Sequence, residues 1–407
     1  MSTAKTVIER DCVIAGGGPA GMVLGYLLAR AGLNVTVLEK HADFLRDFRG
    51  DTIHPSTITL LRELGLVEEF LRLPLSRVNT LDGVIDGTRF TVADFTTLPA
   101  PDNFLVFAPQ WDFLNFLADQ GRLLDGFDLR MSTAGTELVE ENGRIVGVRA
   151  TGPDGDLEIR AALTVAADGR ASTLRDSARL HPEGFGVPID VLWFHLPKPE
   201  NAPPPTIGYV SGKGMVLTLD RGDYYQAGLV IPKGRFARLR DEGMAAFRAR
   251  LASAVPHLKG VVDALEDWDQ IKLLSVQLNR LRTWHRPGFI AIGDAAHAMS
   301  PVFGVGVNYA IQDAVALANA VHAHLAHGAV ADEVLVAVQA RREKPVKKMQ
   351  RLQRLAHRGI ARASKGSGRR VAPRPLLALV AALSPRIRPF MARFIGLGYL
   401  PEHPELG

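Results

Sequence analysis

The sequence of 407 residues predicts an α/β (α+β) fold, in which a Rossmann-like nucleotide-binding domain is interleaved with an antiparallel sheet and followed by a C-terminal helical region. Three observations predict it. A glycine-rich turn at residues 16–21 joins an apolar run to a helical pattern. Two later apolar runs end on Asp168-Gly169 and Gly293-Asp294, and residues 182–278 have the pattern of antiparallel strands with turn residues between them.

The first βαβ unit follows directly from the glycine-rich turn. A strand is expected at Asp11–Ala15, a helix to about Ala31, and a second strand at Asn34–Leu38 that ends on Glu39. The turn between the first strand and the helix reads Gly-x-Gly-x-x-Gly, and an acid follows its last glycine after 18 residues. Strand, helix and acid together predict a dinucleotide-binding site.

Each residue of this motif has a mechanical role. Gly16 makes the tight turn, Gly18 lets the backbone approach a pyrophosphate, and Gly21 lets the helix pack against the strand. Glu39 can accept hydrogen bonds from ribose hydroxyls, and its charge disfavours a nucleotide with a 2′-phosphate. The site therefore suits FAD or NAD, and the motif alone does not choose between them.

The next segments alternate between helix and strand. The loop Arg46–His54 carries Arg49 and Gly50, which suit either a phosphate clamp or a plain surface loop. A helix is expected at Thr57–Leu64, strands between residues 78 and 106, and a helix from Gln110 to about Leu124.

A second β-rich passage covers residues 128–159, with an Asn142-Gly143 hairpin turn. A separate strand is expected at Leu163–Ala167, immediately before Asp168-Gly169. In the region from 182 to 278 we expect three strand segments, a helical segment and a final strand: Val187–Leu196, Thr206–Leu219, Tyr224–Ile231, Arg238–Ala252 and Ile271–Leu278. The apolar side chains of Phe194, Met215, Val216 and Leu229 there favour a hydrophobic ligand.

The last third begins with a strand at Phe289–Ile292, turns at Gly293-Asp294 and Pro301, and enters a helix at Val307–Leu325. A helix start after Gly304 and Gly306 presents free backbone N–H groups to an anionic or electron-rich guest. A further helix is expected at Ala331–Arg358 with an interruption at Pro345, and an amphipathic stretch at Leu376–Leu383.

These segments predict six parts of the chain. Residues 1–76, 107–181 and 279–330 are the three segments of the nucleotide-binding domain, 77–106 and 182–278 supply the substrate-binding sheet, and 331–407 form C-terminal helices and a tail.

Composition excludes several classes of protein. The single cysteine, Cys12, excludes a disulfide framework and a cysteine-based metal site, and we expect no metal ion. We find neither a secretory signal nor an apolar stretch long enough to span a membrane, so the chain is expected to be cytoplasmic. Residues 341–374 hold thirteen Lys and Arg against one acid. Because that segment lacks aromatic side chains, we expect no nucleic acid partner. A solvated helix face followed by a loop, a weak membrane-surface contact and a contact with another polyanion all remain open.

Three motifs, taken in their order along the chain, are more specific than the glycine-rich turn alone. The stretches Gly16–Gly21, Ala167-Asp168-Gly169-Arg170-x-Ser172 and Gly293-Asp294-Ala295-Ala296-His297-x-x-x-Pro301 resemble those of the group A FAD-dependent monooxygenases, the p-hydroxybenzoate hydroxylase family. The resemblance covers nearly the whole chain.

The resemblance implies that FAD is the cofactor and assigns roles to residues. Glu39 and Lys40 would lie at the adenosine, Asp168 and Gly169 at FAD and the passing nicotinamide nucleotide, Asp294 at the ribityl chain, and Pro301 beside the reaction centre. Tyr225, on a strand of the substrate sheet, is a candidate catalytic residue, and His297 is expected to be structural. The cofactor-binding residues expected are Gly16, Gly18, Ala20, Gly21, Glu39, Lys40, Arg49, Gly50, Gln110, Asp168, Gly169, Gly293, Asp294, Gly304, Val305, Gly306, Val307 and Asn308.

The implied activity is hydroxylation of an electron-rich, aromatic or polycyclic hydrophobic molecule. NADPH or NADH would reduce FAD transiently, and O₂ would be activated as a flavin C4a-hydroperoxide. Two alternatives remain: an FAD-dependent reductase or dehydrogenase of the isoprenoid-saturating type, and a flavin-bearing binding module with a basic tail. The residues leave the oligomeric state and the substrate open.

Overall fold

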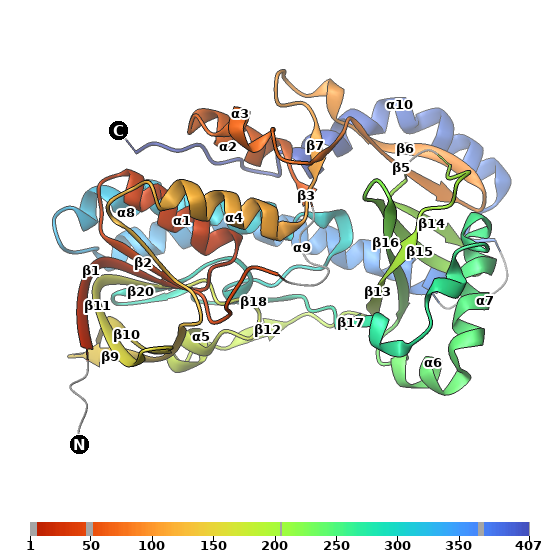
Figure 1. The fold of residues 1–407 in the computed structure, drawn as a ribbon. Coiled ribbons are helices and arrows are strands. Elements are labelled where there is room, and N and C mark those ends of the chain that lie inside the picture. Colours follow the sequence, from red (N-terminus) through yellow and green to blue (C-terminus); the bar gives the residue numbers. More distant parts are fainter. Residues whose placement is uncertain (1–5, 46–51, 204–205, 365–369, 407) are drawn as a thin grey trace.

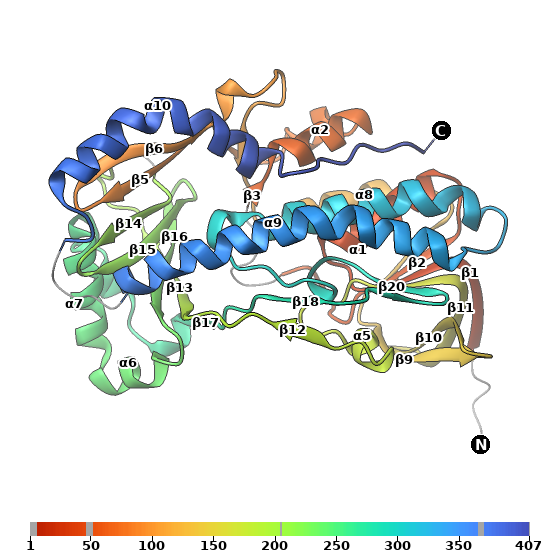
Figure 2. The same cartoon turned by 180° about the vertical axis from the view of Figure 1, so that it is seen from behind.

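Two large sheets stand side by side in the computed structural model, which describes residues 6–45, 52–203, 206–364 and 370–406 (Figures 1 and 2). The mainly parallel sheet lies on the left of Figure 1, and the mainly antiparallel sheet lies on the right. Helix α9 (Asp332–Ser364) extends behind both sheets. Helix α10 (Arg374–Gly396) covers β5 (Thr80–Ile85) and β6 (Thr88–Asp94) at the top of Figure 1. Among the described residues, no helix is both long and apolar enough to cross a membrane.

The first sheet is the Rossmann-like part. Its main strand order is β19-β20-β11-β1-β2-β8, and β1, β2, β8, β11 and β20 are parallel. The hairpin β9–β10 extends it, with Asn142 and Gly143 at φ of 51° and 80° as a two-residue turn of this kind requires. The bounds are β1 Thr6–Ala15, β2 Val35–Leu38, β8 Phe127–Arg130, β9 Ala134–Glu141, β10 Arg144–Gly152, β11 Gly155–Ala166, β19 His285–Arg286 and β20 Phe289–Ala291.

The second sheet has the order β17-β13-β16-β15-β14-β5-β6. Two distant parts of the chain build it, since β5 and β6 come from residues 80–94 and the others from residues 189–274. Helices α6 (Phe236–Glu242) and α7 (Met244–Ala254) pack on one of its faces around the buried Phe194 and Phe247. The bounds are β5 Thr80–Ile85, β6 Thr88–Asp94, β13 Ile189–Pro197, β14 Gly208–Ser211, β15 Gly214–Asp220, β16 Tyr224–Pro232 and β17 Lys272–Leu274.

Short elements connect the two sheets. One small sheet contains β3 Thr52–Ile53, β4 Ser76–Val78 and β7 Leu105–Phe107, and another pairs β12 Pro182–Gly184 with β18 Asn279–Leu281. The remaining helices are α1 Pro19–Arg30, α2 Pro55–Glu63, α3 Val67–Phe70, α4 Gln110–Gly121, α5 Thr173–Ser177, α6 Phe236–Glu242, α7 Met244–Ala254 and α8 Gly306–Leu325. Single 3₁₀ turns occur at 95–97, 256–258, 262–264, 268–270, 293–295 and 302–304.

Several expected boundaries differ in the structure. The strand expected at 163–167 is the end of the longer β11, and the helix expected at 238–252 is two helices that meet at Gly243, whose φ is 87°. Helix α9 continues through Pro345 because Val346 and Met349 are fully buried beside it, and this packing offsets the missing hydrogen bond. Helix α10 likewise continues through Pro385 and Pro389.

Candidate active site

One cavity of about 920 Å³ lies between the two sheets. The ends of three parallel strands reach it, because the turn after β1, the turn after β11 and the turn after β20 all lie at the carboxyl edge of the first sheet. The second sheet supplies the opposite wall. The three motifs that are far apart in the sequence therefore line one space.

The glycine-rich turn is shaped by close backbone contacts. A Cβ at Gly16 would lie 2.3 Å from the carbonyl oxygen of Ala167, and one at Gly21 would lie 1.9 Å from the carbonyl oxygen of Gly16. Gly18 differs, since a Cβ there would meet nothing within 4 Å, and its backbone lines the cavity. Helix α1 starts at this residue without a side-chain cap, so its first N–H groups have no partner from a capping side chain.

Glu39 fixes this turn at the end of β2. Its Oε2 accepts a hydrogen bond from the backbone N–H of Gly17 at 3.1 Å, and its Oε1 accepts one from His41 at 3.0 Å. The side chain is buried and lines the cavity together with Lys40. Glu39 therefore fixes the glycine-rich turn from a position at the cavity wall.

Asp168 follows β11 and is held by the start of α5. Ser172 donates its hydroxyl to the carboxylate, and Leu174 donates its backbone N–H at 3.2 Å. Burial raises the pKa of Asp168 above its ordinary value, and these hydrogen bonds oppose the shift. Gly169 has a φ of 85°, which turns the chain along the cavity wall.

Asp294 follows β20 and faces the same cavity. Its Oδ2 accepts a hydrogen bond from Nη2 of Arg170 at 3.2 Å, and its side chain is one-third exposed. The backbone beneath it is anchored because Gly293 donates its N–H to Asp313 at 3.1 Å. A partly exposed carboxylate that is oriented by an arginine can accept further hydrogen bonds from a hydroxyl-bearing chain.

The start of α8 forms the other end of the cavity. Gly304, Gly306 and Val307 line it, and no side chain caps the helix at Val305. The preceding turn holds Pro301 at the cavity wall. The cavity therefore receives two uncapped helix N-termini, those of α1 and α8, each a site of partial positive charge.

Some expected cofactor residues do not line the cavity. Val305 is fully buried, and Asn308 points to Ser56, whose hydroxyl lies 2.6 Å from Oδ1 of Asn308. Gly21 and Gly293 lie behind the lining residues. Ala20 and Gln110 do line it, whereas Arg49 and Gly50 fall outside the described residues.

Tyr225 is not brought to the cavity. It packs with Val216 and Leu229 in the core under α6 and α7, and its neighbour Gln226 faces the cavity instead. Successive side chains of a strand point to opposite faces of the sheet, so the adjacent residues Tyr225 and Gln226 lie on different faces. The assignment of Tyr225 as a catalytic residue is therefore not retained. Of the four apolar side chains expected to favour a hydrophobic ligand, Met215 lines the cavity, whereas Phe194, Val216 and Leu229 belong to the core on the other face of the sheet.

Sequence reasoning missed His54. It is buried against the cavity, with Nδ1 2.9 Å from the carbonyl oxygen of Ile395 and Nε2 3.0 Å from that of Gly304. Burial lowers its pKa, and the two carbonyl groups oppose the shift. His54 joins α10 to the turn before α8, and nothing in the local sequence marks such a long-range contact.

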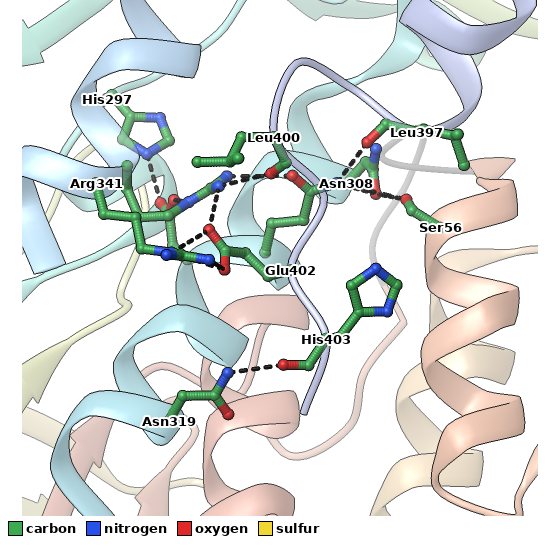
Figure 3. Close-up of polar contacts among 12 residues, drawn as sticks. Ser56, His297, Asn308, Asn319, Arg341, Leu397, Leu400, Glu402 and His403 are labelled. Atoms are coloured by element: carbon green, nitrogen blue, oxygen red, sulfur yellow. Dashed lines mark hydrogen bonds and ion pairs between the residues drawn. The ribbon is translucent and has the colours of Figure 1, made fainter. Parts of the chain in front are cut away.

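A buried ionic network includes Asp313, which also accepts the N–H of Gly293 (Figure 3 shows part of this network). Asp313 accepts from Nε of Arg342 at 2.9 Å and lies 2.5 Å from Nε2 of His297, and Arg342 also contacts Glu402 at 3.0 Å. Burial alone would raise the pKa of Asp313, but His297 and Arg342 hold it below its ordinary value. His297 is thus structural, as expected.

The same network includes the first two residues of the basic segment. Arg342 is fully buried, and the half-exposed Arg341 pairs with the carboxylate of Glu402 at 2.7 Å. The start of segment 341–374 is therefore part of the core and of the C-terminal anchor. Farther along the same helix Lys348, Arg351 and Arg354 are exposed, as expected for a solvated helix face. Figure 3 shows His297 and Arg341 on one side of the C-terminal segment and Asn308 with Ser56 on the other.

Comparison with known proteins identifies the family. A family model described as an FAD binding domain matches residues 9–352. The chain belongs to this FAD-binding family. It is 31% identical over 385 residues to 6-methylpretetramide 4-monooxygenase of Streptomyces rimosus, which covers 94% of this chain and 91% of that protein. It is 29% identical to the 12-dehydrotetracycline 5-monooxygenase/anhydrotetracycline 6-monooxygenase of the same species, over 82% of this chain and 66% of that protein.

Solved structures show the same fold. The anhydrotetracycline hydroxylase OxyS of Streptomyces rimosus superposes with a TM-score of 0.76 at 24% identity, over 98% of this chain and 78% of that one. p-Nitrophenol 4-monooxygenase PnpA of Pseudomonas putida gives 0.76 at 20% identity, over 96% and 97%. The α/β fold expected from the sequence is confirmed. As a member of the FAD-binding family, this protein is an FAD-dependent monooxygenase, and the reductase alternative is not favoured.

The cavity fits FAD. The open space at Gly18 beside the uncapped start of α1 suits a pyrophosphate, and the uncapped start of α8 suits the electron-rich end of a flavin ring. Asp294 lies on the cavity wall with an available carboxylate oxygen.

Replacing Gly18 with valine is expected to weaken FAD retention about 10- to 100-fold, because the added carbons fill space that the apoprotein leaves open. The fold should tolerate the change, since the φ of −75° at Gly18 is ordinary for any residue. FAD occupancy and the melting temperature of the apoprotein are measured. Gly184→Val is the matched control, since Gly184 is an exposed glycine with open space around it, away from the cavity; equal FAD loss in both variants would contradict the assignment.

Proposed function

We propose that this FAD-dependent monooxygenase hydroxylates a flat, polycyclic aromatic molecule, using NADPH or NADH and O₂. The observation that carries the proposal is the shape of the cavity, which reaches from the glycine-rich turn to an apolar face of the second sheet. Its volume, about 920 Å³, lies at the upper end of ligand pockets, so it has room for a cofactor end and a multi-ring substrate. The relative at 31% identity is named for its action on 6-methylpretetramide, which supports the substrate class.

In this proposal the chain acts mainly by binding, orienting and excluding water. The backbone at Gly16, Gly18 and Ala20 holds the pyrophosphate, Glu39 and Lys40 lie at the adenosine, and Asp168 and Gly169 face the nucleotide. FAD, when bound, supplies the redox chemistry that reduced nicotinamide and O₂ require.

The substrate is held in the proposal between the second sheet and the turn before α8. Asp294 accepts from the ribityl hydroxyls, Gln110 borders the cofactor, and the N–H groups at Gly306 and Val307 face the ring. Pro301 lies beside the reacting position, and the apolar side chains of the second sheet exclude water from it. In this proposal residues 1–76, 107–181 and 279–330 are the FAD-binding domain, 77–106 and 182–278 supply the substrate-binding sheet, and 331–407 are the C-terminal helices and tail.

The test is to mix the FAD-loaded protein with NADPH or NADH without oxygen, and then to admit air in the presence of polycyclic aromatic candidates. We expect flavin bleaching by a reduced nicotinamide, followed by a product that is heavier by one oxygen atom. Bleaching with every candidate followed only by hydrogen peroxide would contradict the proposed substrate class. A product that has gained two hydrogens without oxygen would contradict hydroxylation.

A second proposal concerns contact with an anionic membrane surface. The outer face of α10 carries Leu379, Leu383, Ile387 and Phe390, which are 38–65% exposed and recur at helical spacing. The exposed Arg386 and Arg393 lie on the flank of this stripe, and α10 contains no acidic residue. An apolar stripe flanked by arginines is the pattern of a helix that lies in the interface of an anionic bilayer.

Replacing both Leu383 and Ile387 with aspartate is expected to weaken binding to anionic vesicles about tenfold or more, because two apolar side chains become charged. Co-sedimentation is measured with vesicles of phosphatidylcholine alone and of phosphatidylcholine and phosphatidylglycerol in equal amounts. Val336→Asp is the matched control, since Val336 is an exposed apolar residue of α9. Equal binding of wild type and double variant, or none by wild type, would contradict membrane contact.

A further inference from the structure

Gln226 is a buried amide on the cavity face of β16. It is 5% exposed, and it lines the cavity in a wall that is otherwise mostly apolar, next to side chains such as Leu217 and Val230. A polar side chain buried in such a wall needs hydrogen-bond partners for both ends of its amide. The protein supplies partners for one end.

Arg221 determines which way this amide points. Its Nη2 and Nε donate to Oε1 of Gln226 at 3.0 and 3.3 Å. A guanidinium has only donors, so the oxygen of the amide must face it and the nitrogen must face away. Among the residues that the structure describes, no acceptor bonds Nε2 of Gln226. Two N–H donors are therefore left for a ligand.

Trp193 lies on the neighbouring strand β13 and forms part of the same wall. It pairs with Gly228, where a Cβ would lie 3.0 Å from two carbons of the indole ring, so the glycine lets the ring lie close to the strand. The side chain is 7% exposed, and its Nε1 is buried without a partner among the described residues. The wall therefore offers a flat aromatic surface with a further unused donor.

The two side chains are neighbours on the sheet. Trp193 pairs with Gly228, and Gly228 lies two residues from Gln226 on the same strand, a distance of about 7 Å. The side chains of Trp193 and Gln226 both line the cavity. The amide NH₂ of Gln226 and the indole N–H of Trp193 are both hydrogen-bond donors, and neither group can accept a hydrogen bond. The complementary ligand is a flat ring system with oxygen acceptors on its edge, such as the carbonyl groups of a quinone or a polyketide.

We propose that Gln226 and Trp193 form the subsite that binds acceptor oxygens on the edge of the substrate, and that Arg221 is a positioning residue which orients the amide of Gln226. The inference rests on the proposed function, because it assigns the substrate to the same cavity. It narrows the substrate class to polycyclic aromatics that carry carbonyl groups.

The experiment compares two flat probes that differ only in two carbonyl groups, 1-hydroxyanthraquinone and 1-hydroxyanthracene. Their binding to the FAD-loaded protein is measured by calorimetry without reduced nicotinamide, so no turnover is needed. Gln226→Glu keeps the size of the side chain and an acceptor for Arg221 but removes the N–H donors. We expect it to weaken binding of the quinone about five- to tenfold or more and to change binding of the anthracene less than about twofold.

Further variants separate a binding role from a structural one. Trp193→Phe, which keeps an aromatic ring and removes the N–H, is expected to show the same selectivity for the quinone. Arg221→Met should weaken quinone binding in the wild-type background but add little in the Gln226→Glu background, since the two residues act together. Tyr225→Phe is the control on the opposite face of β16 and should change neither probe.

Three results would overturn the inference: equal losses for both probes, no loss for either, or no quinone binding by wild type. FAD content is measured for each variant, so a loss of cofactor is recognised separately. Failure of hydroxylation in the turnover assay, with selective quinone binding intact, would count against the proposed function and leave the subsite standing.

Discussion

Asp294→Asn is expected to weaken FAD retention about 10- to 100-fold, although the substitution keeps the shape of the side chain. The carboxylate accepts a hydrogen bond from Arg170 at 3.2 Å and lines the cavity, so its loss removes a charged acceptor from the proposed ribityl site. The amide oxygen of asparagine can still accept, but a charge-assisted bond is about twice as strong as a neutral one. The FAD dissociation constant is measured by fluorescence titration of the apoprotein.

Asp176→Asn is the matched control for this variant. Asp176 also bonds an arginine, with Arg175 Nε at 3.0 Å, but its side chain is mostly exposed and does not line the cavity. It should retain FAD as wild type does. Asp294→Ala should lose more FAD than Asp294→Asn, since it removes the remaining acceptor. A yellow Asp294→Ala protein with normal FAD content would exclude Asp294 from cofactor binding.

The site could be predicted from the sequence where local pattern and sheet geometry act together. The turn at 16–21 has a mechanical requirement for glycine that the close contacts at Gly16 and Gly21 bear out. Three apolar runs that end on Gly or Asp are brought to one edge because parallel strands end at the same side of a sheet. Asp168 and Asp294 could therefore be named before the fold was known.

Other parts of the site depend on tertiary contacts that a sequence pattern does not record. Strands of the second sheet are buried on both faces, so the alternation of apolar and polar residues does not reveal which side chains face the cavity. For this reason Tyr225 is expected at the site from the sequence, whereas the structure places the adjacent Gln226 there. His54 finds its partners about 250 and 341 residues away. Pro345 lies within a helix because its neighbours are buried, which propensity alone does not predict.

Arg342→Met is expected to lower the free energy of unfolding by about 3–5 kcal/mol, the usual cost of leaving buried charges without their partner. The guanidinium is fully buried and contacts Asp313 at 2.9 Å, Glu402 at 3.0 Å and the carbonyl oxygen of Leu400 at 3.0 Å. Without it, two buried carboxylates lose their shared cation. Denaturant unfolding of the FAD-free protein measures the loss.

A matched control lies one residue earlier in the same helix. Arg341 also bonds Glu402, at 2.7 Å, but its side chain is 55% exposed, so Arg341→Met should cost only about 0–1 kcal/mol.

The Arg342 variant should also bind FAD more weakly, because Asp313 accepts the backbone N–H of Gly293 next to Asp294. The double variant Arg342→Met/Asp313→Asn should lose less unfolding free energy than the sum of the losses of the two single variants, because both changes disrupt the same network. Equal losses of unfolding free energy in the Arg341 and Arg342 variants would show that burial does not set the strength of this network. A loss in the double variant equal to the sum of the two single losses would show that Arg342 and Asp313 contribute independently.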